Sequence, residues 1–341
     1  VVYHNKLGTQ AERSERVQSI AQLIARQLPS LSGADELRRV DEVARLAKTD
    51  LLTDMVGEFP ELQGIMGGYY ARHDGLHADI AEAIEDHYKP RFAGDDLPRN
   101  PVGLVVAMAD KLETLVGMFG IGNLPTGDKD PFALRRHSLG VIRMLRESSL
   151  TMSLSDIIGQ TVAVFGSGIT DPHAQLTAFF YDRLSASLRE QGFSAQEVEA
   201  VLALRPQQLS DITRRLQAVR AFVALPESQA LAAANKRIGN ILKKADDVQG
   251  EVNASLLTEA AEKALFQTMQ QLTPEASKLW AAGDYTASLQ TLSALRQPVD
   301  AFFDDVMVNA EDLALRQNRQ RLLKQLHVAM NQVADLACLA V

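Results

Sequence analysis

The sequence predicts an all-α fold. Ala, Leu, Arg, Glu and Gln are abundant, whereas aromatic residues make up only 6% of the chain and Trp occurs once. This composition favours helices over sheets. Apolar residues recur at helical spacing along most of the chain, and no Asn-Gly turn lies between alternating strands. With 341 residues, of which 46% are hydrophobic, the chain is long enough to form two or three packed units.

The first part of the chain begins with two amphipathic helices. Val17, Ile20 and Ile24 share one stripe of the first, and Val40 and Val43 lie on one stripe of the second. Glycine and proline then predict turns, and an apolar stretch with few charges predicts a buried helix between two loops. The predicted order is helix 11–28, helix 35–56, turns 57–68, helices within 69–88, loop 89–101, buried helix 102–118 and loop 120–130.

A further helix is predicted to start at Pro131, with Asp130 as its N-cap. One turn in, it presents Arg135 and Arg136, which either bind phosphate oxygens or pair with neighbouring acids. Ser and Thr cluster at residues 147–155, where we expect the domain boundary. The predicted domains are 1–150 and 151–341, and the second contains helices at 209–223 and 311–339.

Charge is unevenly distributed. The net charge is −8, which argues against a general nucleic-acid binder because phosphate binding draws on Lys and Arg. The segment from Arg205 to Ala245 nevertheless holds eight Lys or Arg and only two acids, Asp211 and Glu227. A basic segment in an acidic chain indicates either one directed anionic partner or a solvated helix face.

Three features bear on metal sites, nucleotide loops and location. The dyad His73–Asp74, with His77, His87 and Asp110, suggests the metal site of an HD-type phosphohydrolase, but its spacing fits poorly and solvated polar residues explain it better. The glycines at 117–127 lack the nucleotide-loop fingerprint and indicate a turn. The single cysteine, Cys338, and the lack of a long apolar run or a signal peptide fit the cytoplasm.

Several strings resemble the β subunit of bacterial glycyl-tRNA synthetase, in that family's order and over essentially the whole chain. They are KTDLLTDMVGEFPELQGIMGGYYA (48–71), HYKPRFAGDDLP (87–98), VAMADKLETLVGMFGIG (106–122), PTGDKDPFALRRHSLGVIRML (125–145), AANKRIGNILKKAD (233–246) and AFFDDVMVNAEDLALRQNRQRLL (301–323).

The resemblance implies a fold and a set of partners. The fold is an HD-like helical domain followed by a DALR-type helical anticodon-binding domain, and the chain corresponds to the family's C-terminal part. The family's α subunit holds the active site for glycine and ATP, so ATP and Mg are expected there and no cofactor is expected in this chain. The implied partners are glycine tRNA and the α subunit, in an α2β2 heterotetramer without a membrane. The implied activity is that of a glycine–tRNA ligase, with this fragment non-catalytic alone.

The resemblance also bears on the candidate residues. The family's HD dyad falls near Lys48–Thr49–Asp50, where the histidine is missing and Asp50 and Asp110 are the surviving acids. Two carboxylates without histidines make a poor transition-metal site, so we expect no catalytic or metal residues. The candidate tRNA-binding residues, chosen by residue type and helical position, are Arg135, Arg136, Lys236, Arg237, Asn240, Lys243, Lys244, Arg316, Asn318 and Arg319.

Three hypotheses follow from the sequence. The favoured one is the tRNA-binding part of a glycine–tRNA ligase, which recognises glycine tRNA, including its anticodon, for ATP-dependent aminoacylation. The alternative is an HD-type metal-dependent phosphohydrolase, which bound metal and phosphate release would support. A third is a helical protein-interaction scaffold, which would show no salt-dependent affinity for RNA.

Overall fold

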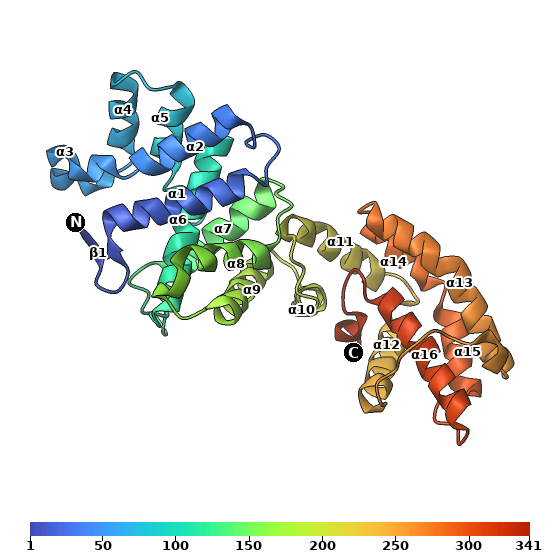
Figure 1. The fold of residues 1–341 in the computed structure, drawn as a ribbon. Helices are drawn as coiled ribbons and strands as arrows, with labels where there is room; N and C mark the ends of the chain where they lie inside the picture. Colours follow the sequence, from blue (N-terminus) through green and yellow to red (C-terminus); the bar gives the residue numbers. More distant parts are fainter. The chain divides into compact units, whose positions relative to one another are not determined.

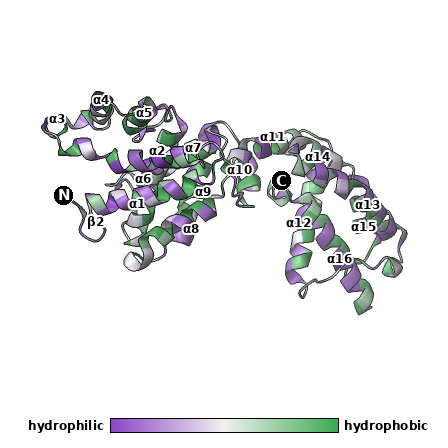
Figure 2. Cartoon of the chain, turned by 45° about the horizontal axis from the view of Figure 1, so that its top comes forward, coloured by the Kyte–Doolittle hydropathy of each residue, from purple (hydrophilic) through white to green (hydrophobic).

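A computed structural model describes residues Val1–Val341 and confirms the all-α prediction (Figure 1). The only strands are β1 (Val2–His4) and β2 (Gly8–Thr9), which pair as a short antiparallel hairpin that the sequence analysis did not anticipate. Most helices carry a hydrophilic and a hydrophobic face, seen as alternating purple and green in Figure 2. No helix combines the length and apolar character needed to cross a membrane.

The chain divides into two compact units. Unit 1 comprises Val1–Leu184 and Gln207–Ser210, and unit 2 comprises Ser185–Pro206 and Asp211–Val341. The sequence predicts a boundary near residue 150 instead. The division lies later because α8 packs against α1 and α6 and therefore belongs to the core of unit 1.

Unit 1 is built around one buried helix, α6, on which nearly every side chain is shielded from solvent. Asn100 caps it and Pro101 occupies its first turn, as those residue types favour. Helices α1, α2, α5, α7 and α8 pack around it. The helices are α1 (Gln10–Ala25), α2 (Ala34–Leu46), η1 (Thr49–Leu52), α3 (Asp54–Glu58), η2 (Pro60–Leu62), α4 (Ile65–His73), α5 (Ala78–Asp86), α6 (Pro101–Gly120), α7 (Leu134–Glu147), α8 (Leu154–Phe165), η3 (Gly166–Gly168) and α9 (His173–Glu190), which runs on into unit 2.

Unit 2 is a bundle in which α12 packs on α16, and α13 packs on α14, α15 and α16. Its apolar core includes Leu265, Leu322 and Leu326. The helices are α10 (Ala195–Leu202), η4 (Leu209–Asp211, mostly in unit 1), α11 (Ile212–Val223), α12 (Ser228–Lys244), η5 (Ala254–Leu256), α13 (Ala260–Ala281), α14 (Tyr285–Ser293), α15 (Arg296–Asp305), α16 (Leu313–Met330) and η6 (Leu336–Leu339).

Two predicted helices are shorter than expected. The helix predicted at 35–56 ends at Leu46, because Asp50 turns inward and accepts hydrogen bonds from the N–H groups of Gly64 and Gly67. The last helix ends at Met330 rather than residue 339. There the side-chain Oδ1 of Asn331 accepts a hydrogen bond from the N–H of Leu336, which closes a turn.

The start of α7 also differs from the prediction. The helix begins at Leu134 rather than Pro131, and the residue before it, Ala133, has a φ of 54°. Asp130 still satisfies the first helical N–H groups, because its carboxylate accepts hydrogen bonds from the N–H groups of Leu134 and Arg135. The N-cap is Ala133 and not Asp130, so the N-cap and the first helical residue were both placed three positions too early, although the Asp130 carboxylate does bond to the start of the helix.

Candidate nucleic-acid interface

Helix α12 has one buried face and one basic face. Leu231 and Ile238 point into the core of unit 2, whereas Lys236, Arg237 and Lys244 are exposed. Lys236 and Arg237 lie near the middle of the helix, and Lys243 and Lys244 lie in its last turn, where the helix dipole favours positive charge. Part of the basic segment found in the sequence therefore forms one exposed face of a helix.

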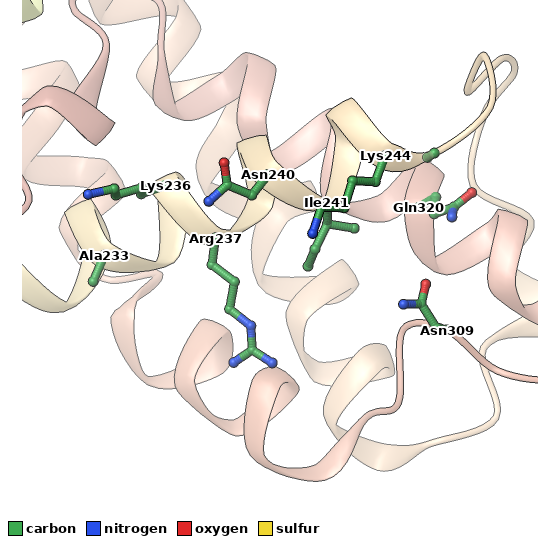
Figure 3. A pocket seen from close by; sticks show the side chains of 9 residues that line it. Ala233, Lys236, Arg237, Asn240, Ile241, Lys244, Asn309 and Gln320 are labelled. Carbon is green, nitrogen blue, oxygen red and sulfur yellow. The ribbon is translucent and has the colours of Figure 1, made fainter.

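A groove with a volume of about 470 Å³ follows this face (Figure 3). In the close-up, α12 forms one side of the groove, and the amide side chains of Asn309 and Gln320 lie on the other. Asn309 comes from the loop before α16, and Gln320 comes from α16 itself. The lining residues are Ala233, Lys236, Arg237, Asn240, Ile241, Lys244, Ala245, Asn309 and Gln320.

The chemistry of this groove suits a nucleic acid. It holds three cationic side chains and three amides but no carboxylate, although acids outnumber bases in the chain, 43 to 35. Lys and Arg neutralise phosphates, and the amides can donate to and accept from base edges. An aromatic surface lies beside these groups, because the Arg237 guanidinium stacks 4.2 Å from the centroid of the Phe303 ring.

The groove continues past the end of α12. A second hollow, of about 330 Å³, shares Lys244, Asn309 and Gln320 with the first. It adds Arg316, Gln317 and Arg321 from α16, and Asp246 and Asp247 from the segment that follows α12. We call the two hollows together the α12–α16 groove. Five of the predicted residues line it: Lys236, Arg237, Asn240, Lys244 and Arg316.

Two predicted residues are removed from this surface by burial. Asn318 is fully buried and holds the segment before α13, since its side chain exchanges two hydrogen bonds with the backbone of Asn253, at 2.7 and 3.0 Å. Arg319 is 5% exposed and forms an ion pair with Glu262 at 3.1 Å. It also donates a 2.8 Å hydrogen bond to the Met307 carbonyl. Both side chains organise unit 2 and do not face the groove.

The remaining predicted residues lie elsewhere. Lys243 is exposed on α12 but is not among the lining residues. Arg135 and Arg136 belong to α7 in unit 1, where the Arg135 guanidinium donates a 2.6 Å hydrogen bond to the Gly127 carbonyl and Arg136 is exposed. One N–H group of Arg135 is thus engaged by the loop that precedes α7.

Asn309 and Gln320 are lining residues that the sequence analysis missed. Gln320 follows Arg316 by four residues and so lies one turn along the same face of α16. The helical spacing from Arg316 could therefore have predicted that Gln320 lies on the same face of α16. Asn309 lies in a loop, and no periodic signal indicates where a loop side chain points.

Unit 1 buries a cluster of charges where the family's HD dyad was expected. The Asp110 carboxylate pairs with Arg13 at 3.0 Å and with Lys48 at 3.4 Å, and Arg13 also pairs with Glu113 at 2.9 Å. Although burial disfavours ionisation, Arg13 and Lys48 hold the pKa of Asp110 well below its usual range. Burial lowers the pKa of Lys48 to about 8, even though Asp110 favours its charged form.

This cluster bears on the phosphohydrolase alternative. The carboxylate that would ligate a metal is engaged by an arginine and a lysine, and Asp50 accepts two backbone N–H groups. Burial, reinforced by Lys48, lowers the pKa of His87 to about 3. No group of three or more His, Cys, Asp or Glu side chains is arranged to hold a metal. His73 and Asp74, the sequence dyad, are exposed at the end of α4.

Comparisons with known proteins agree with these observations. Residues 1–203 match the family model of the glycyl-tRNA synthetase beta subunit, and residues 231–337 match that of the DALR anticodon binding domain. The chain is 67% identical to the glycine–tRNA ligase beta subunit of Paracidovorax citrulli and 67% identical to that of Delftia acidovorans. In both comparisons the match covers 100% of this chain and 48% of the relative. The chain thus spans about half the length of the curated relatives it matches.

Proposed function

The chain belongs to the glycyl-tRNA synthetase beta subunit family, and we propose that it forms the tRNA-binding part of a glycine–tRNA ligase. The α12–α16 groove is the proposed contact with the anticodon loop. The observation that carries this proposal is the concentration of Lys236, Arg237 and Lys244 in the first hollow of this groove, which no carboxylate lines, within the residues that match the DALR anticodon binding domain.

The roles of the groove residues follow from their chemistry. The flexible ammonium groups of Lys236 and Lys244 neutralise backbone phosphates. The amides of Asn240, Asn309 and Gln320 pair with the edges of unstacked bases, as in other single-stranded RNA sites. Because phosphate contacts carry no sequence information, these amides are the residues expected to distinguish one anticodon from another.

The wider assembly is part of the same proposal. The chain acts with an α subunit that carries the ATP-dependent aminoacylation site, in an α2β2 heterotetramer in the cytoplasm, and ATP and Mg bind at that subunit. The chain supplies no catalytic residues of its own. This agrees with the burial of Asp110 between Arg13 and Lys48, which leaves its carboxylate engaged by protein cations.

Titration with RNA tests the proposal. The purified chain is titrated with glycine tRNA and with variants changed at the second and third anticodon bases, at two salt concentrations. We expect saturable binding that weakens with salt and with the anticodon changes. The same titration with the Asn240→Ala variant tests base recognition. We expect this variant to discriminate between the anticodons about tenfold less than the wild type, which is the scale of one good base contact.

The alternative outcomes are distinct. If affinity falls with salt but ignores the anticodon, the groove binds phosphates without reading bases, and anticodon recognition in this chain is refuted. Absence of binding at low salt would refute the proposal that this chain holds tRNA at all.

A further inference from the structure

A third hollow lies on another side of α16. It has a volume of about 530 Å³ and is formed by α13, α16 and the segment that follows α12. Its walls are mainly apolar, and Phe266, Met269 and Val328 contribute to them. Val328 is 59% exposed and presents an apolar surface to this hollow.

The walls also present a backbone acceptor. Pro274 lies inside α13 and has no N–H to donate to the carbonyl of Gln270, four residues earlier. Gln270 and Pro274 both line the hollow, so this carbonyl lies on the same face of the helix. A ligand that offers an N–H group there would supply the hydrogen bond that the helix lacks.

The rim of the hollow is cationic. Arg321 and Lys324 are its only charged residues, and no carboxylate lines it. Each of them donates to the backbone of the segment after α12. The Arg321 Nε donates to the Gln249 carbonyl at 2.7 Å, and the Lys324 Nζ donates to the Val248 carbonyl at 2.6 Å. Both cations retain further N–H groups for an anion at the rim.

The hollow adjoins the α12–α16 groove. Arg321, Val248 and Gln249 line both and form the wall that they share, so a strand that leaves the groove across this segment comes next to the hollow. Apolar walls with an aromatic ring, a carbonyl that lacks its usual helical N–H donor and a cationic rim match three features of a nucleotide: the faces of the base, an exocyclic amino group and the phosphate.

We propose that this hollow binds an unstacked base that carries an exocyclic amino group, adenine, cytosine or guanine, from the same RNA strand that occupies the α12–α16 groove. The base lies against Phe266 and Met269, its amino group donates to the Gln270 carbonyl, and its phosphate lies between Arg321 and Lys324. The proposal rests on the tRNA-binding function proposed above and adds a second base site to it.

The test places a carboxylate in the hollow. Val328→Asp is compared with Val223→Asp, which makes the same change at another exposed helical valine that lines none of the three hollows. We expect Val328→Asp to weaken binding of glycine tRNA by about tenfold, the scale of one stacked base, and Val223→Asp to leave it within about twofold. Phe266→Leu, which keeps an apolar side chain but removes the ring, should also weaken binding.

A second readout locates the base. A fluorescent adenine analogue, 2-aminopurine, is placed at successive positions of the anticodon loop, and its emission is followed on binding. We expect one position to change its emission with the wild-type chain and with Val223→Asp but not with Val328→Asp. Replacing the natural base at that position with uracil should lower the affinity of the wild-type chain and not that of Val328→Asp.

The outcomes separate the two proposals. If the wild-type chain binds tRNA and both valine variants bind equally well, the second base site is refuted and the tRNA-binding function stands. If Val328→Asp weakens binding but uracil is accepted as readily as adenine, cytosine or guanine, the assignment of the amino group to Gln270 is overturned. If the wild-type chain binds no tRNA, both proposals fail.

Discussion

Replacing Arg319 with methionine tests the structural role that burial assigns to this residue. Arg319 donates to both oxygens of the Glu262 carboxylate and to the Met307 carbonyl. Glu262 is fully buried, and its other three donors all reach one oxygen, Oε1, from Thr258 and Glu259. Methionine therefore leaves Oε2 of a buried carboxylate without a partner.

The expected loss in free energy of unfolding follows from the number of donors that the Glu262 carboxylate keeps. Breaking a buried ion pair costs about 3–5 kcal/mol in free energy of unfolding. Because Oε1 keeps its three donors, we expect the Arg319→Met variant to lose about 3 kcal/mol, at the lower end of that range. The double variant Arg319→Met/Glu262→Met removes the stranded charge but also the acceptor used by Thr258 and Glu259, so it should recover part of the loss. Urea denaturation of the four proteins completes the cycle.

The same variants distinguish a structural residue from an RNA contact. If Arg319 acts only in the core of unit 2, the folded double variant binds glycine tRNA with an affinity within about twofold of the wild type, because Arg319 does not line the groove. A large loss of RNA affinity with an unchanged free energy of unfolding would refute the reasoning and return Arg319 to the binding surface, where the sequence analysis placed it.

Three further predictions follow. Asn318→Ala removes both hydrogen bonds to Asn253, so limited proteolysis should cut the segment 246–259 faster than in Gln317→Ala, an exposed neighbour; equal rates would contradict the anchoring role. Burial lowers the pKa of Lys111 to about 8, so the unfolded chain binds more protons above that pH and the free energy of unfolding rises toward about pH 10. Lys48, whose pKa is also about 8, contributes to the same rise, so Lys111→Met should reduce the rise in denaturation curves without abolishing it; an unchanged slope would exclude Lys111 as one of its sources. Hydrogen bonding by Arg319 lowers the pKa of Glu262 despite its burial, so this contribution is present above about pH 4.3 and is lost in acid. The difference between wild type and Arg319→Met should therefore shrink as pH falls through that range, and a constant difference would argue against the ion pair.

Helical periodicity predicted the fold class because it depends on the local spacing of apolar residues. The periodicity misplaced the end of a helix where a side chain from outside that helix, or just beyond its last residue, determined where the helix stops. Asp50 ends the second predicted helix by bonding to Gly64 and Gly67, which lie too far along the chain for a local pattern to show. The apolar spacing continues through Leu336, but α16 ends before that residue, at Met330. Leu336 reaches the core from the turn that the Asn331 side chain closes, and not from the helix.

The candidate site was predicted in part for a similar reason. The residues of α12 were found because basic charge concentrates on one short segment, and the helical period places most of it on one face. Residue type could not distinguish Arg316, which lines the groove, from Arg319, which is buried three residues later. That distinction depends on Glu262, which comes from a different helix. Long-range partners of this kind decide which polar residues of a helix remain available to a ligand.

The central claim is that the basic face of α12 holds RNA phosphates. Lys236→Gln/Lys244→Gln removes two cations from the groove, and Lys263→Gln/Lys278→Gln removes two exposed cations from α13 as the matched control. The affinity for glycine tRNA is measured across a series of salt concentrations. We predict that the slope of log affinity against log salt falls by about 1.4–1.8 for the groove variant, about 0.7–0.9 for each lost phosphate contact, and is unchanged for the control. Equal slopes for the two variants would contradict the account.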